Sequence, residues 1–88
     1  MRIESAVASI VLTDRQVAVV GYVVEHGEIS NSELQEQFTV AKRTAGRDLS
    51  FLVTEGIFDK RGTRGVGVHY VLTEKGQDWA KSNKLMGP

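Results

Sequence analysis

Hydrophobic residues in the first half of the chain recur at the spacing of α-helices. The first predicted helix covers residues 14–26. It begins after Thr13, which with Gln16 forms a capping box, and it ends before Gly27, a residue suited to the left-handed backbone of a helix end. Valines fill this segment on most sides, so most of the helix surface should be buried. Because valine also favours strands, a strand remains the competing interpretation.

A second capping box, Ser30 with Glu33, predicts a short helix over residues 33–38. A one- or two-residue strand at Ile29 leads into it. Residues 39–40 follow as a tight turn. A further helix, over residues 42–54, is predicted directly after this turn. Two helices joined by so short a turn form the pattern of a helix-turn-helix.

The segment 42–54, ended by Gly56, predicts a helix with two different faces. At about 100° per residue, the polar and basic residues fall on one side and the apolar ones on the other. Such a helix can pack on a small core and still present cations to a partner. The polar side contains Arg43, Arg47, Ser50 and Thr54, and the buried side contains Ala45, Leu49 and Leu52.

Two β-prone runs, 57–61 and 68–72, flank a glycine-rich turn and predict a hairpin. Arg64 lies near its tip. After the hairpin, Thr73 is expected to begin a last short helix over 74–81. We expect the core side of the hairpin to consist of Ile57 and Val71 with either Phe58 or Tyr70.

The chain begins with an apolar leader, residues 1–12, whose spacing fits a helix, although a short strand over 6–12 fits as well. The leader predicts either a segment packed on the domain or a homodimer contact through residues 1–26. The chain then divides into this leader, a domain over 13–81 and a loose tail, 82–88.

Composition narrows the function classes. A chain of 88 residues without cysteine makes one small domain with no disulfide and no thiolate site. The two histidines stand in no metal-binding motif, and no catalytic triad is recognisable, so we expect no enzyme, metal, cofactor or small-molecule ligand. Since no apolar run approaches 18 residues and no signal peptide is visible, we expect no membrane contact and a cytoplasmic location, on the nucleoid if the host is a prokaryote.

Charge is unevenly distributed although the net charge is zero. Residues 1–38 carry two arginines against six acidic residues, whereas residues 39–65 carry six cations against three acidic residues. Such asymmetry fits a basic surface for a polyanion, but solvated charges can also fall this way by chance. Asp48 lies among the cations, and we expect it to pair within the molecule.

Taken together, the elements predict an α+β winged helix-turn-helix: a three-helix core, a two-stranded β-hairpin wing and a short C-terminal helix. The stretches ISNSELQEQF and TVAKRTAGRDLSFLVTEGIF resemble that fold. The second resembles the recognition helix of DeoR-type regulators, and even more the winged helix at the C-terminal end of Fic-domain proteins and of some helicase-like ATPases. The resemblance covers about residues 13–80. It departs from the family at Ala41, where Ser or Thr usually caps the helix, and Gly46 weakens the helix interior.

The resemblance implies binding of double-stranded DNA in transcriptional regulation, with helix 42–54 in the major groove and the wing, residues 61–68, on the backbone or minor groove. Arginines are suited to guanine edges, and the other cations and hydroxyls to phosphates. The alternative is a protein–protein or intramolecular module of a larger protein. The predicted DNA contacts are Lys42, Arg43, Thr44, Arg47, Ser50, Lys60, Arg61, Arg64 and Ser32.

Overall fold

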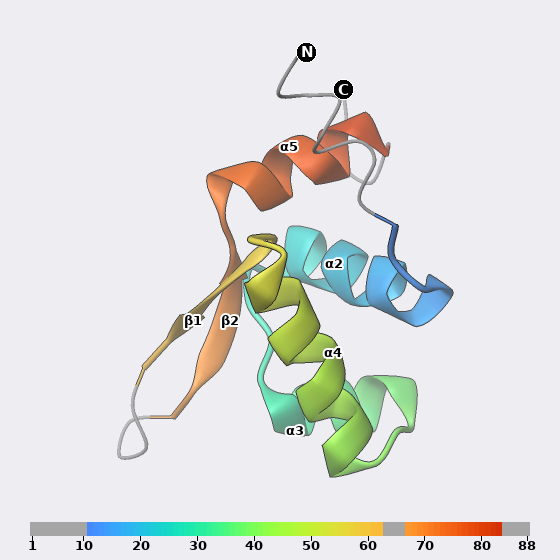
Figure 1. Cartoon of the computed structure of the whole chain (residues 1–88). Coiled ribbons are helices and arrows are strands. Elements are labelled where there is room, and N and C mark those ends of the chain that lie inside the picture. The colour runs from blue at the N-terminus through green and yellow to red at the C-terminus, as the bar shows by residue number, and fades with distance from the viewer. Residues whose placement is uncertain (1–10, 63–66, 84–88) are drawn as a thin grey trace.

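The structure, a computed structural model, describes residues 11–62 and 67–83. It contains four helices and one two-stranded sheet within these residues, and confirms the α+β winged helix-turn-helix (Figure 1). The elements, in chain order, are α2 (Asp14–His26), α3 (Asn31–Phe38), α4 (Lys42–Thr54), β1 (Phe58–Arg61), β2 (His69–Leu72) and α5 (Glu74–Ser82).

The two predicted capping boxes are both present. The Thr13 hydroxyl accepts a hydrogen bond from the Gln16 amide at 3.1 Å, and the Gln16 side chain accepts one from the Thr13 amide at 3.0 Å. Ser30 and Glu33 repeat this exchange at the start of α3. Gly27 ends α2 with a φ of 94°, as expected for a residue without a side chain to clash. The helix interpretation of residues 14–26 is therefore confirmed.

The start of α4 has no side-chain cap, as the alanine at position 41 predicts. The turn before it is tight because Thr39 adopts a left-handed backbone with a φ of 53°. After the helix, Gly56 has a φ of 80°, which reverses the chain toward β1. Local geometry therefore fixes both ends of α4, even though its first turn lacks a hydrogen-bonding side chain.

The hairpin is antiparallel, with Phe58 opposite Leu72 and Lys60 opposite Tyr70. An isolated bridge between Ile29 and Tyr70 joins the segment before α3 to β2. The prediction that Val71 belongs to the core side is wrong. Val71 stands opposite Asp59, one residue out of phase with the positions that pack on the core, and adjacent residues in a strand point to opposite faces. Ile57, Phe58, Tyr70 and Leu72 supply the core side.

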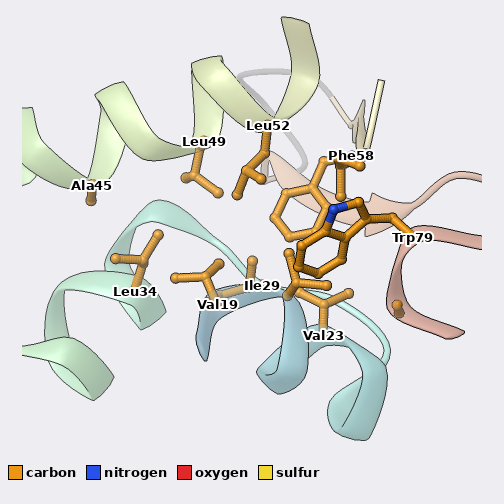
Figure 2. Close-up of a cluster of buried hydrophobic side chains, with 12 residues drawn as sticks. Val19, Val23, Ile29, Leu34, Ala45, Leu49, Leu52, Phe58 and Trp79 are labelled. Atoms are coloured by element: carbon orange, nitrogen blue, oxygen red, sulfur yellow. The ribbon is translucent and has the colours of Figure 1, made fainter. Parts of the chain in front are cut away.

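The hydrophobic core lies between α2, α3 and α4 and extends to the hairpin and α5. In Figure 2, Leu49 and Leu52 of α4 face Val19 and Val23 of α2 across Ile29, with Phe58 and Trp79 side by side at one end. The buried set comprises Val19, Val20, Val23, Ile29, Leu34, Ala45, Leu49, Leu52, Ile57, Phe58, Trp79 and Ala80.

The last helix is attached to the corner between α4 and β1. The Thr73 hydroxyl accepts from the Gly76 amide at 2.9 Å and donates to the backbone carbonyls of Gly56 and Ile57. A Cβ on Gly76 would lie 2.1 Å from the Ile57 carbonyl oxygen, so only glycine allows this approach. The helix ends at Ser82, one residue beyond the predicted end, and the expected loose tail beyond Asn83 lies outside the described residues, as does the leader up to residue 10.

Within the part of the chain that is described, no helix combines the length and apolar character needed to cross a bilayer.

Candidate nucleic-acid interface

Helix α4 separates its apolar and polar residues as the sequence predicts. The buried face (Ala45, Leu49, Leu52) is fully excluded from solvent. The open face (Arg43, Arg47, Ser50, Thr54) is exposed along the whole helix. Burial of one side fixes the helix in the domain, and the other side is left free to contact a partner.

The cations of α4 have no carboxylate partner in the described part of the chain. Lys42, Arg43 and Arg47 are exposed, and none of them forms an ion pair with any other residue that the structure describes. Thr44, another predicted contact, is half-buried. Since an unpaired surface charge keeps its full attraction for an opposite charge, this end of α4 presents a positive surface.

Asp48 lies on α4 between the two faces and is held inside the molecule. Its carboxylate accepts from Arg15 Nε at 2.5 Å and from Gln16 Nε2 at 3.2 Å. Only 5% of the Asp48 side chain is exposed, against 38% of the Arg15 side chain. The hydrogen bond to Asp48 raises the pKa of the Arg15 guanidinium further above its usual range. The prediction that Asp48 pairs within the molecule is confirmed.

The Asp48 contacts connect the start of α2 to the middle of α4. Gln16 takes part twice, because its amide oxygen caps α2 through Thr13 while its amide nitrogen donates to Asp48. Only the capping role of Gln16 was predicted from the sequence. The second role depends on a contact across 32 residues, and no local periodicity in the sequence signals it.

The short helix α3 lies beside the first half of α4. Ser32, in the first turn of α3, is exposed as its predicted phosphate contact requires. Its neighbour Asn31 accepts a hydrogen bond from Gln35 at 2.5 Å. A Cβ built on Gly46 would lie 3.7 Å from Asn31 Nδ2, so Gly46 faces α3 and an alanine would fit there in ordinary contact.

The hairpin separates two cations that the sequence analysis grouped together. Lys60 stands opposite Tyr70, whereas Arg61 is one residue further along β1 and therefore points to the other face. Arg61 Nε donates to the Asp59 carboxylate at 2.8 Å, and both side chains are more than half exposed. Lys60 has no such partner among the described residues. Arg64, near the tip, lies outside the described residues.

A pocket of about 200 Å³ opens between α4 and the hairpin. The sequence analysis named Ser50 and Lys60 as contacts but not Thr54 or Tyr70, which also line this pocket. Thr54 could have been found from its place on the polar side of α4. Tyr70 was predicted only as an alternative to Phe58 on the core side of the hairpin, and its place at the pocket depends on how the hairpin packs against α4. We call this the α4–hairpin pocket, lined by Ser50, Val53, Thr54, Lys60 and Tyr70.

Comparison with solved structures confirms the fold. A mutant of ZitR from Lactococcus lactis superposes with a TM-score of 0.76 at 20% identity, over 88% of this chain and 53% of that one. A mutant of MarR from Escherichia coli has a TM-score of 0.72 at 23% identity, over 84% and 57% of the two chains. A transcriptional regulator from Thermotoga maritima has a TM-score of 0.72 at 23% identity, over 80% and 50%. The chain thus spans about half the length of these proteins.

Sequence comparison identifies the family. No curated protein matches the chain. The family model of the DeoR-like helix-turn-helix domain matches residues 15–68, from the start of α2 to the residue before β2. This match covers more than half of the chain and includes α3, α4 and β1, the elements on which the predicted resemblance to DeoR-type regulators rests. The chain therefore belongs to the family of DeoR-like helix-turn-helix domains, DNA-binding domains of transcriptional regulation.

Proposed function

We propose that this domain binds duplex DNA by placing α4 in the major groove, with the wing on the adjacent backbone or minor groove. The observation that carries the proposal is the pair Arg43 and Arg47. Both are exposed, lie one turn apart on the open face of α4, and have no carboxylate partner among the described residues. The α-helix has the width that the major groove admits.

The predicted contacts divide into two kinds. In this proposal Arg43 and Arg47 read base edges, because arginine can donate to both O6 and N7 of guanine. Thr44 lies beside them on α4, and the hydroxyl of Ser50, also on α4, is suited to a phosphate. The remaining residues contact phosphates and position the domain on the duplex, which carries affinity but no sequence information. These are Lys42, Ser32, Lys60, Arg61 and, at the wing tip, Arg64.

Direct titration tests the proposal. The protein as given, titrated with a fluorescent random-sequence duplex at low salt, should bind with an affinity that falls steeply as salt increases, since phosphate contacts release counterions. The same titration with the double variant Arg43→Ala and Arg47→Ala should show weaker binding at every salt concentration. Absence of binding by the unmodified protein at low salt would overturn the proposal.

We further propose that the domain acts as a cytoplasmic, non-catalytic homodimer through residues 1–26. Helix-turn-helix proteins commonly bind as dimers to two half-sites one helical turn apart. Val11, just before α2, is 85% exposed, and Ala18 on α2 is exposed as well, so apolar surface is open on this side. Light scattering at micromolar concentration checks the assembly. A mass of one chain over the whole concentration range would contradict the dimer and leave the DNA proposal intact.

A further inference from the structure

The placement of the hairpin beside α4 has a geometric consequence for bound DNA. The major groove is bordered on each side by a sugar–phosphate backbone. A helix seated in that groove therefore has one backbone on each flank. The hairpin packs against α4 and extends away from the helices along one flank (Figure 1). If α4 occupies the groove, the backbone on that side would run close to the space between α4 and the hairpin, where the α4–hairpin pocket lies.

We propose that the α4–hairpin pocket is a phosphate-binding site, which holds one phosphate of the duplex backbone between α4 and the hairpin. This proposal rests on the proposed DNA binding and deepens it, because it adds Thr54 and Tyr70 to the contacts and unites residues of two elements around one ligand group. The occupant is the DNA backbone, a polyanion whose phosphate presents several acceptor oxygens.

The chemistry of the lining fits a phosphate. Lys60 supplies a positive charge, and Ser50, Thr54 and Tyr70 each carry a hydroxyl that can donate to a phosphate oxygen. None of these side chains forms a hydrogen bond or ion pair with another described residue, so their donors are free. The pocket has a volume of about 200 Å³, which is several times the roughly 30 Å³ that one water molecule occupies in the liquid. The pocket therefore has room for a phosphate group.

The described side chains that line the pocket include no charge that would repel an anion. No carboxylate of the described residues lines the pocket. The nearest acidic position on β1, Asp59, alternates to the other face of the hairpin, where Arg61 pairs with it at 2.8 Å. The arrangement therefore leaves Lys60 free on the pocket side, and the Asp59 carboxylate is paired on the far side.

A phosphate bound in this pocket would determine the orientation of α4 in the major groove. The pocket is built partly from α4 and partly from the hairpin, so one phosphate bound to both fixes α4 relative to the backbone. Contacts of this kind determine orientation and register on the duplex, and they leave base recognition to Arg43 and Arg47. We therefore expect the pocket residues to affect affinity equally on all DNA sequences.

The first test compares two lysines in salt titrations of a random-sequence duplex. Lys60→Gln should reduce the slope of log K against log salt by about 0.9, the effect expected for one lost phosphate contact. Lys81→Gln is the matched control, because it removes the same charge from the last turn of α5, a helix that supplies no residue to the pocket. The proposal is overturned if both variants change the slope equally or if Lys60→Gln leaves it unchanged.

The second test removes hydroxyls and leaves charge and shape nearly unchanged. Thr54→Val and Tyr70→Phe should each weaken binding about five-fold at every salt concentration, with no change of slope, because a neutral hydrogen bond is lost and no counterion is involved. Ser82→Ala, at the end of α5, is the control for removal of an exposed hydroxyl. Thermal unfolding checks that each variant is folded. Unchanged affinity in both pocket variants would overturn the assignment.

These outcomes are separable from failure of the proposed function. In one outcome, the unmodified protein binds DNA and the arginine variants bind it more weakly, while the pocket variants behave like their controls. That result would overturn only the phosphate-binding site. If the unmodified protein does not bind DNA at low salt, both the proposed function and the phosphate-binding site are overturned.

Discussion

Two neighbouring residues of α4 carry charges of opposite sign in very different surroundings. Arg47 and Asp48 are adjacent in sequence and about 100° apart around the helix. Arg47 is exposed and has no ion-pair partner among the described residues, whereas Asp48 is buried and accepts hydrogen bonds from Arg15 and Gln16 of α2. The comparison shows that partners in the fold, and not position in sequence, distinguish a charge that supports the fold from one that is left open to solvent.

Arg15 and Arg47 show the same contrast between two residues of one type. Arg15 is tied to Asp48 and so holds α2 against α4. The Arg47 side chain is exposed and forms no hydrogen bond or ion pair with another residue that the structure describes. Loss of Arg15 should therefore lower stability, whereas loss of Arg47 should weaken DNA binding.

The largest effect is expected from the buried face. Leu49→Ala should lower the free energy of unfolding by about 3 kcal/mol, because Leu49 is fully buried in the core and the substitution leaves a cavity. Urea unfolding followed by circular dichroism measures this loss. Leu49→Met, which nearly conserves the volume, should cost less than about 1.5 kcal/mol. Equal losses in both variants would show that shape, rather than cavity formation, dominates at this site.

On the open face, Arg43→Ala and Arg47→Ala should each weaken DNA binding by about 1–3 kcal/mol if each arginine contacts a guanine. Their unfolding free energy should change by less than about 0.5 kcal/mol, the range usual for surface residues away from special features. Parallel DNA titrations and urea unfolding measure both quantities. A loss of stability comparable to the loss of binding would mean that these arginines support the fold.

Asp48→Asn should lower stability without weakening DNA binding, the reverse of what we expect for the two arginine variants. Removal of the carboxylate from its hydrogen bonds with Arg15 and Gln16 should cost about 1–2 kcal/mol of stability, a modest value because Arg15 is partly solvated. DNA binding by the folded variant should not weaken, since a negative charge near a polyanion is lost. Weaker binding without any loss of stability would place Asp48 on the DNA side and contradict the comparison.

The smallest effect is expected at the start of α4. Ala41→Ser should raise the unfolding free energy by about 0.5–1 kcal/mol, because it adds the missing side-chain cap to a position whose backbone is already extended, with φ −71° and ψ 158°. Thermal unfolding measures the gain. Ala41→Val, which supplies no acceptor, is the control and should not stabilise the helix. Stabilisation by both would show that the gain has another cause than capping.

The sequence alone determined the secondary structure and the two faces of α4. Capping boxes, end glycines and periodicity are local signals, because each depends on residues within one or two turns of each other. For this reason both capping boxes, the left-handed glycines and the buried set Ala45, Leu49 and Leu52 were predicted and are found in the structure. The family resemblance rests on the same local pattern.

Tertiary structure alone decided which side chains meet across the chain. The Arg15–Asp48 pair joins residues 33 positions apart, and the hairpin register places Lys60 opposite Tyr70. The error at Val71 has the same origin, since a shift of one residue in a strand exchanges its two faces. The α4–hairpin pocket likewise exists only where two elements pack side by side, so hydrophobic periodicity could suggest its residues singly but could not bring them together.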